Sequence, residues 1–343
     1  VERVGFPVLI RPSYVLSGTR MRIANSQEEL ERYMRDVHSN HKGHSVVVSK
    51  FMKDSTEAEL DCATDGKSII GVTMRHIEEA GVHSGDATIV TPFESNATEK
   101  MHDIALALAK ALHIKGAFNL QFVISKGEPY VIELNLRASR SMPFSSKSVG
   151  INLIEYAMKG IYQSFGWSGF YEPEHKSFVV KSPQFSWSQL RGAYPYLSPE
   201  MKSTGEVAAF GDSLHDALVK SWLAATPNKV PKKGVLIYGL SNVQSLATAA
   251  ENLKQYAEVY TLANAKINGV EELSMENAIG MLKSGGIDLL VTDNYMKETD
   301  YEIRRLAADL NIPLILNGRL GQEVSASFSR LSDGLTFKEM REY

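Results

Sequence analysis

The feature of this sequence that most constrains its fold is a strict alternation of strand and helix patterns near the C-terminus. Apolar runs of strand length and segments with helical spacing follow one another as strand 235–238, helix 242–256, strand 259–262, helix 274–284, strand 287–292, helix 299–310 and strand 312–316. This order predicts parallel strands covered by helices, because each helix must return the chain to the same end of the sheet. We therefore expect an α/β flavodoxin-like parallel-sheet domain over residues 234–343.

The preceding part of the chain follows a different pattern, because short turns join its strands. The turn at Asp65-Gly66 joins strand patterns at 57–63 and 69–74, and the turn at 125–128 joins strands at 117–124 and 129–136. Strands joined in this way pair antiparallel.

Helices are interspersed among these strands. Ser26 and Glu29 form a capping box that opens one helix, and helical spacing recurs at 97–112, 153–163 and 214–224. We expect an α+β domain over residues 1–225 and a linker at 226–233, where prolines and lysines occur without periodicity.

Composition excludes several classes of protein. The chain has 343 residues with 37 basic and 40 acidic side chains, a net charge of −3, and neither sign gathers into a long run. Nucleic acid and membrane surfaces are therefore not expected as partners. The apolar runs are too short to span a bilayer, and the single cysteine, Cys62, is compatible with a reducing compartment, so we expect a cytoplasmic protein. The chain opens on Val1 without an initiator Met, which predicts that it starts inside a larger fold.

The strongest candidate site lies in the hairpin at 117–140, which reads AFNLQFVISKGEPYVIELNLRASR. Residues two apart in a strand face the same way, so Glu133, Asn135 and Arg137 share one face, and the turn brings Gln121 roughly opposite Glu133. Carboxylate and amide oxygens are ligands that Mg²⁺ prefers, and arginines suit phosphates. Taken alone, the spacing also fits an ordinary solvent-exposed strand face, and both interpretations stay open.

Two further clusters could carry chemistry. RPSYVLSGTRM, residues 11–21, runs from a strand into a small-residue loop that could approach phosphates, although Arg11 could simply pair with a carboxylate. HIEEAGVHSGD, residues 76–86, reads as a loop in which His83 could hydrogen-bond a ribose or stabilise its own loop. The sequence contains no G-x-S-x-G, H-E-x-x-H or G-x-G-x-x-G, which disfavours hydrolase, zinc protease and dinucleotide-binding functions.

Five segments in order resemble the second synthetase half of carbamoyl phosphate synthase large subunits. They are RPSYVLSGTRM, EAGVHSGD, the Q-F-x(10)-E-L-N-L-R-A-S-R segment, VKSPQFSWSQL and PEMKSTGEV, and the likeness spans residues 4–225. The resemblance implies an ATP-grasp fold that binds ATP and phosphorylates carbamate to carbamoyl phosphate, for arginine and pyrimidine synthesis.

The resemblance also implies roles for individual residues. The nucleotide would be bound by Arg11, Lys50, Met52, Glu57, Gly81, Val82, His83 and Ser84, with Glu57 facing the ribose or a monovalent cation such as K⁺. Gln121, Glu133 and Asn135 would be ligands of Mg²⁺ or Mn²⁺, with Gln121 and Glu133 also contacting the nucleotide. Arg137 and Arg140 would hold carbamate and stabilise charge on the transferred phosphoryl group.

The sequence departs from the family in several places. Leu136 stands where many members have Pro, SGTRM replaces a two-glycine loop, and an upstream part of the synthetase half is missing, so the fragment alone is expected to be inactive. The implied partners are that missing part of the large subunit and a glutamine amidotransferase small subunit that supplies ammonia.

The segment from residue 234 resembles the methylglyoxal-synthase-like domain that binds allosteric effectors in this family. DYEIRRLAADLNIPLI, residues 300–315, carries that likeness, whereas the expected Thr-His-Gly-Thr effector loop reads Leu-Ala-Asn-Ala at 262–265. A purely structural domain is the alternative. For the whole chain, the alternatives are another ATP-grasp carboxylate ligase, such as a biotin carboxylase relative, and a nucleotide-binding regulatory or interaction protein without turnover.

Overall fold

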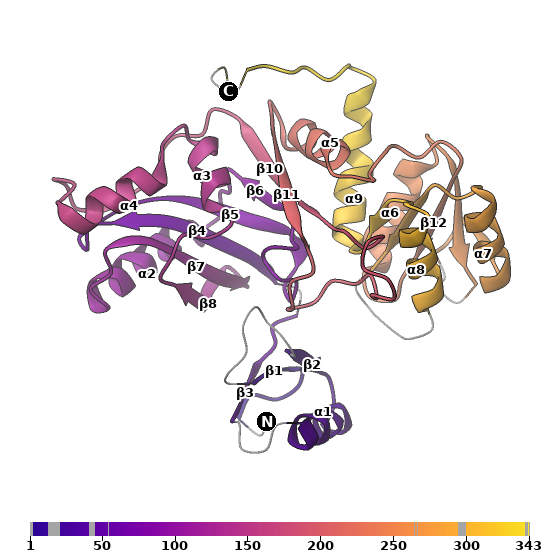
Figure 1. Cartoon of the computed structure of the whole chain (residues 1–343), viewed down its shortest axis with the longest axis horizontal. Coiled ribbons are helices and arrows are strands. Elements are labelled where there is room, and N and C mark those ends of the chain that lie inside the picture. Colours follow the sequence, from indigo (N-terminus) through magenta and orange to yellow (C-terminus); the bar gives the residue numbers. More distant parts are fainter. Residues whose placement is uncertain are drawn as a thin grey trace.

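The computed structural model describes residues 3–12, 21–40, 45–53, 55–263, 265, 267–293, 300–339 and 342, with the backbone alone over 36–40. The small-residue loop at 13–20 and Asn264 of the effector-loop segment lie outside the described residues. Three sheets organise the described chain (Figure 1).

The N-terminal sheet is small and antiparallel, in the order β2-β1-β3. Its elements are β1 (Val8–Pro12), β2 (Arg22–Ala24), α1 (Gln27–Asn40) and β3 (Val46–Lys50). Ser26 caps the helix as predicted, because its hydroxyl accepts the Glu29 N–H at 3.3 Å, whereas the Glu29 carboxylate accepts the N–H of Asn25, one residue before the cap, at 2.8 Å. Figure 1 shows this sheet and its helix as a separate lobe below the main sheet.

The main sheet runs in the order β11-β10-β6-β5-β4-β7-β8, with β9 paired to β5. Its strands are β4 (Thr56–Thr64), β5 (Ser68–Glu79), β6 (Ile89–Thr91), β7 (Gly116–Ser125), β8 (Glu128–Asn135), β9 (Gly169–Tyr171), β10 (Phe178–Gln184) and β11 (Gly205–Gly211). Both predicted hairpins, β4–β5 and β7–β8, are antiparallel pairs. Strand β5 continues to Glu79, beyond its predicted end at Met74, because it also pairs with β6.

Helices cover both faces of the main sheet. They are α2 (Thr98–Ala111), α3 (Met142–Ser148), α4 (Leu153–Tyr162) and α5 (Leu214–Ala224). Apolar residues of α2 pack with alternate side chains of β4 and β7, such as Leu60, Phe118 and Leu120. Residues of α3 and α4 pack on the opposite face against Ile70, Val72 and other side chains.

The C-terminal sheet is parallel, with the order β14-β13-β12-β15-β16. Its strands are β12 (Gly234–Tyr238), β13 (Glu258–Leu262), β14 (Glu271–Leu273), β15 (Leu289–Thr292) and β16 (Leu314–Ile315). The four predicted strands lie in the order 2-1-3-4, as flavodoxin-like sheets begin, and the short β14, which was not predicted, extends one edge. The predicted parallel α/β architecture is confirmed.

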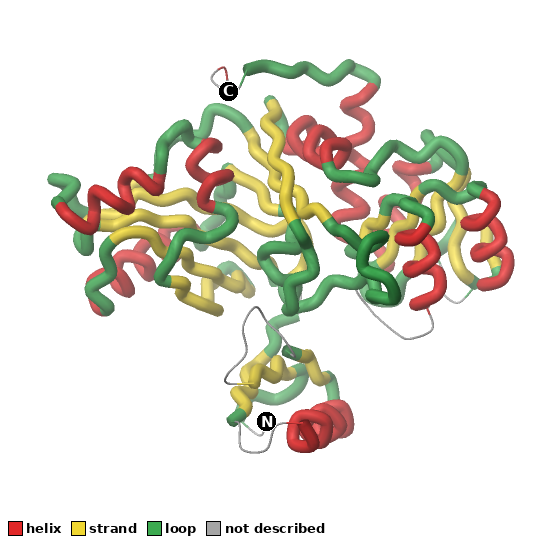
Figure 2. The backbone as a smooth tube through the Cα atoms, in the orientation of Figure 1, coloured by secondary structure: helices red, strands yellow, loops and turns green. Residues whose placement is uncertain are grey.

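Helices lie along both faces of this sheet (Figure 2). They are α6 (Val243–Leu253), α7 (Met275–Ser284), α8 (Tyr301–Asp309) and α9 (Gly318–Ser327), followed by a short 3₁₀ turn, Phe328–Leu331. Helices α6 and α9 share one apolar cluster with α5 and with Ile77, Val90 and Val180 of the main sheet. The C-terminal domain is therefore joined to the main sheet by a continuous core.

A polar clamp strengthens the same junction. The Arg304 guanidinium, which is fully buried, donates to the Pro195 carbonyl, and its Nε lies 2.6 Å from Asp300. The neighbouring Arg305 donates to the carbonyls of Trp187, Leu190 and Ala193. Helix α8 thus satisfies carbonyl groups of a segment that belongs to the first part of the chain.

Candidate functional site

One face of the main sheet carries a row of acids and amides. Side chains alternate between faces along a strand, so Glu57, Glu59 and Asp61 of β4 lie on the face opposite to α2. Glu59 pairs with Gln121 on β7, and Asp61 pairs with Asn119. On the sheet face opposite α2, these strands therefore gather the polar side chains at one end, and the apolar cluster under α3 and α4 occupies the other end.

The predicted opposition of Gln121 and Glu133 is confirmed by the strand register, which also places Asn119 opposite Asn135. The register shifts between Gln121 and Phe122, so that Ile132 bulges from β8. Glu133 is exposed, whereas Gln121 and Asn135 are half-buried. The trio lies at the accessible edge of the acidic row, and its role as a metal site stays a prediction.

His76 bridges two of the acids. Its Nε2 lies 2.7 Å from Glu59 Oε1, and its Nδ1 lies 3.5 Å from Glu57 Oε2. Burial alone would raise the pKa of Glu59, but the hydrogen bond and charge of His76 lower it. Burial alone would lower the pKa of His76, but Glu59 raises it. Both shifts favour the ionised pair.

Asp61 is the deepest acid of the row, with 0% exposure. It accepts hydrogen bonds from Asn119 Nδ2 at 2.9 Å, Ser139 Oγ at 2.5 Å and Ser145 Oγ at 2.9 Å. Burial nevertheless raises its pKa above the usual range. The serines come from the segment after β8, so this network fixes that segment to β4.

The predicted nucleotide loop, Gly81–Ser84, follows β5 and lies beside the acidic row. The Gly81 N–H donates to Glu57 Oε1 at 2.8 Å, and Gln121 Nε2 donates to Ser84 Oγ at 3.2 Å. A Cβ on Gly81, which has a φ of +106°, would lie 3.4 Å from the Phe51 ring. The loop, the metal-ligand candidates and the end of the N-terminal sheet therefore adjoin one another.

His83 and Val82 are anchored by contacts with the segment 187–198 and within their own loop. The His83 N–H donates to the Ser198 carbonyl at 2.9 Å, and its Nδ1 accepts the Gly85 N–H at 3.0 Å. Burial lowers the pKa of His83, and Val82 is buried in a small apolar cluster with Trp187 and Leu197. These contacts fit one of the two roles considered for His83, stabilisation of its own loop, and binding of the nucleotide by His83 stays a prediction.

A buried lysine that sequence reasoning missed holds the same loop. Lys181 of β10 donates from Nζ to the carbonyls of Ser84 and Gly85, each at 3.2 Å. Burial lowers its pKa. Sequence reasoning likewise missed Glu59, Asp61 and Asn119 as parts of the site, and it placed His76 in a loop at 76–86, whereas His76 belongs to β5. The only signal was the alternation of acids from Glu57 to Asp61.

The two predicted catalytic arginines follow β8. Arg137 donates from its guanidinium to Asn135 Oδ1 at 3.4 Å and to the Ala138 carbonyl at 3.1 Å. Arg140 pairs with Glu206 of β11, with 2.9 Å between nitrogen and oxygen. Arg137 thus lies beside Asn135, whereas Arg140 reaches β11, the strand at the opposite end of the sheet order from β8.

The remaining nucleotide candidates belong to the N-terminal lobe. Arg11 lies in β1 opposite Val47. Lys50 Nζ donates to the Phe6 carbonyl at 2.8 Å, and the Met52 carbonyl accepts from Ser55 Oγ at 2.7 Å. Lys50 and Met52 thus flank Phe51, whose ring lies beside Gly81, and Lys50 has a carbonyl partner within its own lobe.

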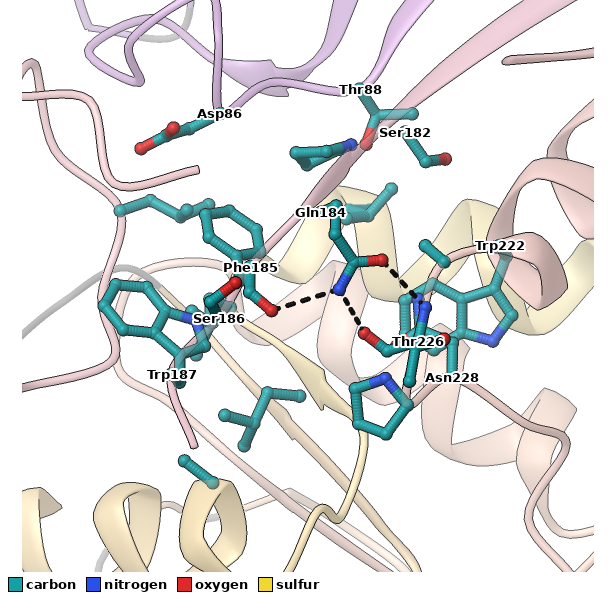
Figure 3. A pocket seen from close by; sticks show the side chains of 18 of the residues that line it. Asp86, Thr88, Ser182, Gln184, Phe185, Ser186, Trp187, Trp222, Thr226 and Asn228 are labelled. Carbon is teal, nitrogen blue, oxygen red and sulfur yellow. Dashed lines mark hydrogen bonds between the residues drawn. The ribbon is translucent and has the colours of Figure 1, made fainter. Parts of the chain in front are cut away.

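A cavity of about 360 Å³ lies between the main sheet and the C-terminal domain (Figure 3). On its wall, the Gln184 amide donates to the carbonyls of Phe185 and Thr226 and accepts the Thr226 N–H (Figure 3). Glu78 Oε1 and the indole N–H groups of Trp187 and Trp222 also belong to lining residues, and they have no hydrogen-bond partner within the described chain. The cavity is apolar with a few unpartnered polar groups.

The described residues contain no group of three or more His, Cys, Asp or Glu side chains arranged to hold a metal ion. Among the described helices, none is both long enough and apolar enough to cross a membrane.

The comparisons with known proteins agree with the predicted resemblance. Residues 1–161 match the family described as carbamoyl-phosphate synthase L chain, ATP binding domain. The whole chain is 53% identical to part of the carbamoyl phosphate synthase large chain of Sulfurisphaera tokodaii and 50% identical to that of Sulfolobus acidocaldarius. Each alignment covers 100% of this chain and 33% of the relative, so the chain spans about a third of the curated relatives it matches.

A solved structure is similar at a greater distance. The biotin carboxylase domain of Hydrogenobacter thermophilus 2-oxoglutarate carboxylase, in complex with MgADP, aligns with a TM-score of 0.49 and 15% identity, over 66% of this chain and 58% of that chain. The sequence comparisons, together with the antiparallel sheets and the parallel sheet that follows, confirm the predicted fold class, an ATP-grasp domain followed by an α/β domain. Residues 1–161 therefore match the ATP-binding domain of the carbamoyl phosphate synthase large chain, and the whole chain is a homologue of about a third of such a large chain.

Proposed function

We propose that this chain carries the ATP-dependent phosphorylation of carbamate to carbamoyl phosphate. The observation that carries the proposal is the Gln121–Glu133 pair at the accessible edge of the buried acidic row, in a chain about half identical to these large chains along its whole length. Ammonia would come from glutamine through an amidotransferase subunit, and the remaining part of a large chain would activate bicarbonate. The product would supply arginine and pyrimidine synthesis.

The residues present fit a magnesium or manganese site of mixed ligands. Mg²⁺ is usually held by one or two carboxylates together with phosphates of the substrate, rather than by a cage of acids. Glu133 supplies one carboxylate, and Gln121 and Asn135 supply amide oxygens on the same face. The metal would neutralise charge on the ATP phosphates.

The other residues would bind and orient the substrates. Arg137 and Arg140 would hold carbamate and the transferred phosphoryl group, because guanidinium groups bind such anions through paired N–H donors. The Gly81–Ser84 loop would contact the nucleotide, held by Glu57 and Lys181. Arg11, Lys50 and Met52 would close on the nucleotide from the N-terminal lobe. Glu57 Oε2 lies near His76, so the ribose or a K⁺ ion that binds Glu57 would share its carboxylate with His76.

The first experiment is the reverse partial reaction, in which carbamoyl phosphate and MgADP form ATP. It is measured on the chain alone and on a version extended upstream to a complete synthetase half. We expect activity in the extended version, abolished by Glu133→Ala but retained by Glu128→Ala, an exposed glutamate on the same strand that pairs with Lys100. Nucleotide binding without ATP formation would favour the regulatory alternative.

We propose effector binding in the cavity between the main sheet and the C-terminal domain, supported by its volume of about 360 Å³ and by lining residues from both, such as Gln184, Asn311 and Leu320. Cavities of this size with a mainly apolar wall and a few polar groups are typical sites for small molecules. Amino acids and nucleoside monophosphates are the probes, and we expect one class to raise the melting temperature and change the KM for nucleotide. No response to either class would leave this domain a structural one.

A further inference from the structure

We propose that Asn317 and Arg319 of the C-terminal domain position the predicted nucleotide loop by holding Glu79. This inference rests on the proposed function, because it concerns how that loop is set for nucleotide. Glu79 is the last residue of β5 and precedes Gly81 by two residues. Asn317 and Arg319 stand at the start of α9, more than two hundred residues later in the chain.

The contacts involve both oxygens of the Glu79 carboxylate. Asn317 Nδ2 donates to Glu79 Oε2 at 2.5 Å, and Arg319 Nε lies 3.1 Å from Glu79 Oε1. The carboxylate also lies at the N-terminal end of α9, where the helix dipole favours negative charge. Each contact acts on the same side chain, so together they fix the direction in which the chain leaves β5.

The anchor itself is rigid. Asn317 is 1% exposed and is the N-cap of α9, where its Oδ1 accepts the Leu320 N–H at 3.1 Å. Both ends of its amide are therefore engaged. A Cβ on Gly318 would lie 2.5 Å from Asn242, and one on Gly321 would lie 2.8 Å from Val291. This close approach holds the first turn of α9 against the C-terminal sheet.

The loop is also fastened beyond Glu79. Its Gly81 N–H donates to Glu57, the His83 N–H donates to Ser198, and the Asp86 carboxylate accepts the N–H groups of Lys202 and Ser203. All of these partners belong to the first part of the chain. Glu79 therefore adds a fastening from the C-terminal domain at the point where the loop begins.

The effect is expected on the loop rather than on global stability. Arg319 is 34% exposed and Glu79 20% exposed, and ion pairs of this exposure contribute little to folding. The expected effect on nucleotide affinity is larger than the effect on folding. Glu79 lies just before the loop, and a small displacement of a binding group lowers affinity without unfolding the protein. Arg319 and Asn317 are thus positioning residues and have no contact with the reacting atoms.

The test uses Arg319→Met, Glu79→Gln and the double variant in the extended chain, with MgADP as the varied substrate of the reverse reaction. We expect each single variant to raise the KM for MgADP about threefold to tenfold with kcat nearly unchanged. The double variant should be no worse than the more impaired single variant, because the two residues act through one contact. Arg319→Lys should restore part of the loss.

Arg330→Met is the matched control, since it also removes a guanidinium from the C-terminal domain and breaks only the surface pair with Asp333. It should leave the KM unchanged. An unchanged KM in Arg319→Met and Glu79→Gln, or fully additive effects in the double variant, would overturn the inference while the proposed function stands.

A second measurement distinguishes failure of the proposed function from failure of the positioning role. If the unsubstituted chain forms no ATP, the same variants are compared by calorimetric titration with ADP. Weaker ADP binding in Arg319→Met and Glu79→Gln, but not in Arg330→Met, would retain the positioning role. Absence of ADP binding by the unsubstituted chain would remove both proposals.

Discussion

His76 and Glu59 form a buried ion pair inside the main sheet, with 2.7 Å between Nε2 and Oε1 and only 1% and 3% of the two side chains exposed. Charges so far from water persist only when they are paired and hydrogen-bonded. Asn119 Nδ2 donates to the other Glu59 oxygen at 3.2 Å, which completes the environment of the carboxylate. The pair therefore ties β5, β4 and β7 together below the candidate site.

Replacing His76 should destabilise the protein strongly. His76→Ala leaves Glu59 buried without its cation, and losses of about 3–5 kcal/mol are typical when one partner of such a pair is removed. Denaturant unfolding measures the change. His76→Ala combined with Glu59→Leu should recover part of the loss, because the more deeply buried of the two carboxylates that His76 contacts is removed with it, and Glu57 keeps the Gly81 N–H. A single variant as stable as the unsubstituted chain would show that the pair is not ionised.

The same pair predicts a pH dependence with two limits. The pKa of His76 is raised by Glu59, so its stabilisation is complete below the unfolded value of about 6.5 and is lost as pH rises through the folded pKa. The pKa of Glu59 is lowered by His76, so its stabilisation is complete above about 4.3 and is lost as pH falls through the folded pKa. Free energies of unfolding measured across pH should show both losses, and both should be absent from the His76→Ala, Glu59→Leu variant.

Arg140 offers a test of function separated from stability. Its pair with Glu206 is 40% and 33% exposed, and pairs of this kind contribute less than about 1 kcal/mol. Arg140→Met should therefore leave the melting temperature almost unchanged. If Arg140 stabilises charge on the phosphoryl group, the reverse reaction should fall about a hundredfold or more, as for the loss of other transition-state donors. The exposed Arg191→Met is the control, and equal activity in the two variants would contradict the role of Arg140.

The sequence allowed the hairpins and the parallel sheet to be predicted, because both follow from local patterns. Asp65-Gly66 marks a turn between alternating strands, and the Gln121–Glu133 opposition follows from the length of the next turn. The alternation of Glu57, Glu59 and Asp61, however, indicated only a strand of the β4–β5 hairpin. The hydrogen bonds that satisfy buried Asp61 come from Ser139 and Ser145, far along the chain.

Helix α9 was not predicted for a related reason. Gly318 and Gly321 weaken a helix by local propensity. In the fold, Gly321 instead allows α9 to approach β15, where a Cβ would lie 2.8 Å from Val291. Strands β10 and β11 were also not predicted, because they pair across an aromatic loop with no turn signature. Each of these features depends on contacts between segments distant in the sequence.

The hydrogen bonds of the Glu172 carboxylate predict that the protein loses stability in acid. Its carboxylate accepts the Thr73 N–H at 2.6 Å and the Thr73 hydroxyl at 2.7 Å, and it lies 3.1 Å from His102. Although burial opposes the shift, these contacts lower its pKa to about 2. The stabilisation is therefore present above the unfolded pKa of about 4.3 and is lost between about pH 4.3 and 2. Glu172→Gln should unfold more easily at pH 7, by about 2 kcal/mol, and its stability should vary less over this acid range.

Two glycines inside helices predict opposite effects of one added methyl group. A Cβ on Gly160 of α4 would lie 2.2 Å from the Thr64 carbonyl oxygen, so Gly160→Ala must displace the helix from β4. Such overpacking typically costs about 1–3 kcal/mol. Gly280 of α7 has nothing within 4 Å of the same position, so Gly280→Ala should stabilise by about 0.5–1 kcal/mol through its better helix propensity. Denaturant unfolding of both variants separates packing from propensity. Equal changes of the same sign would show that α4 does not approach Thr64 so closely.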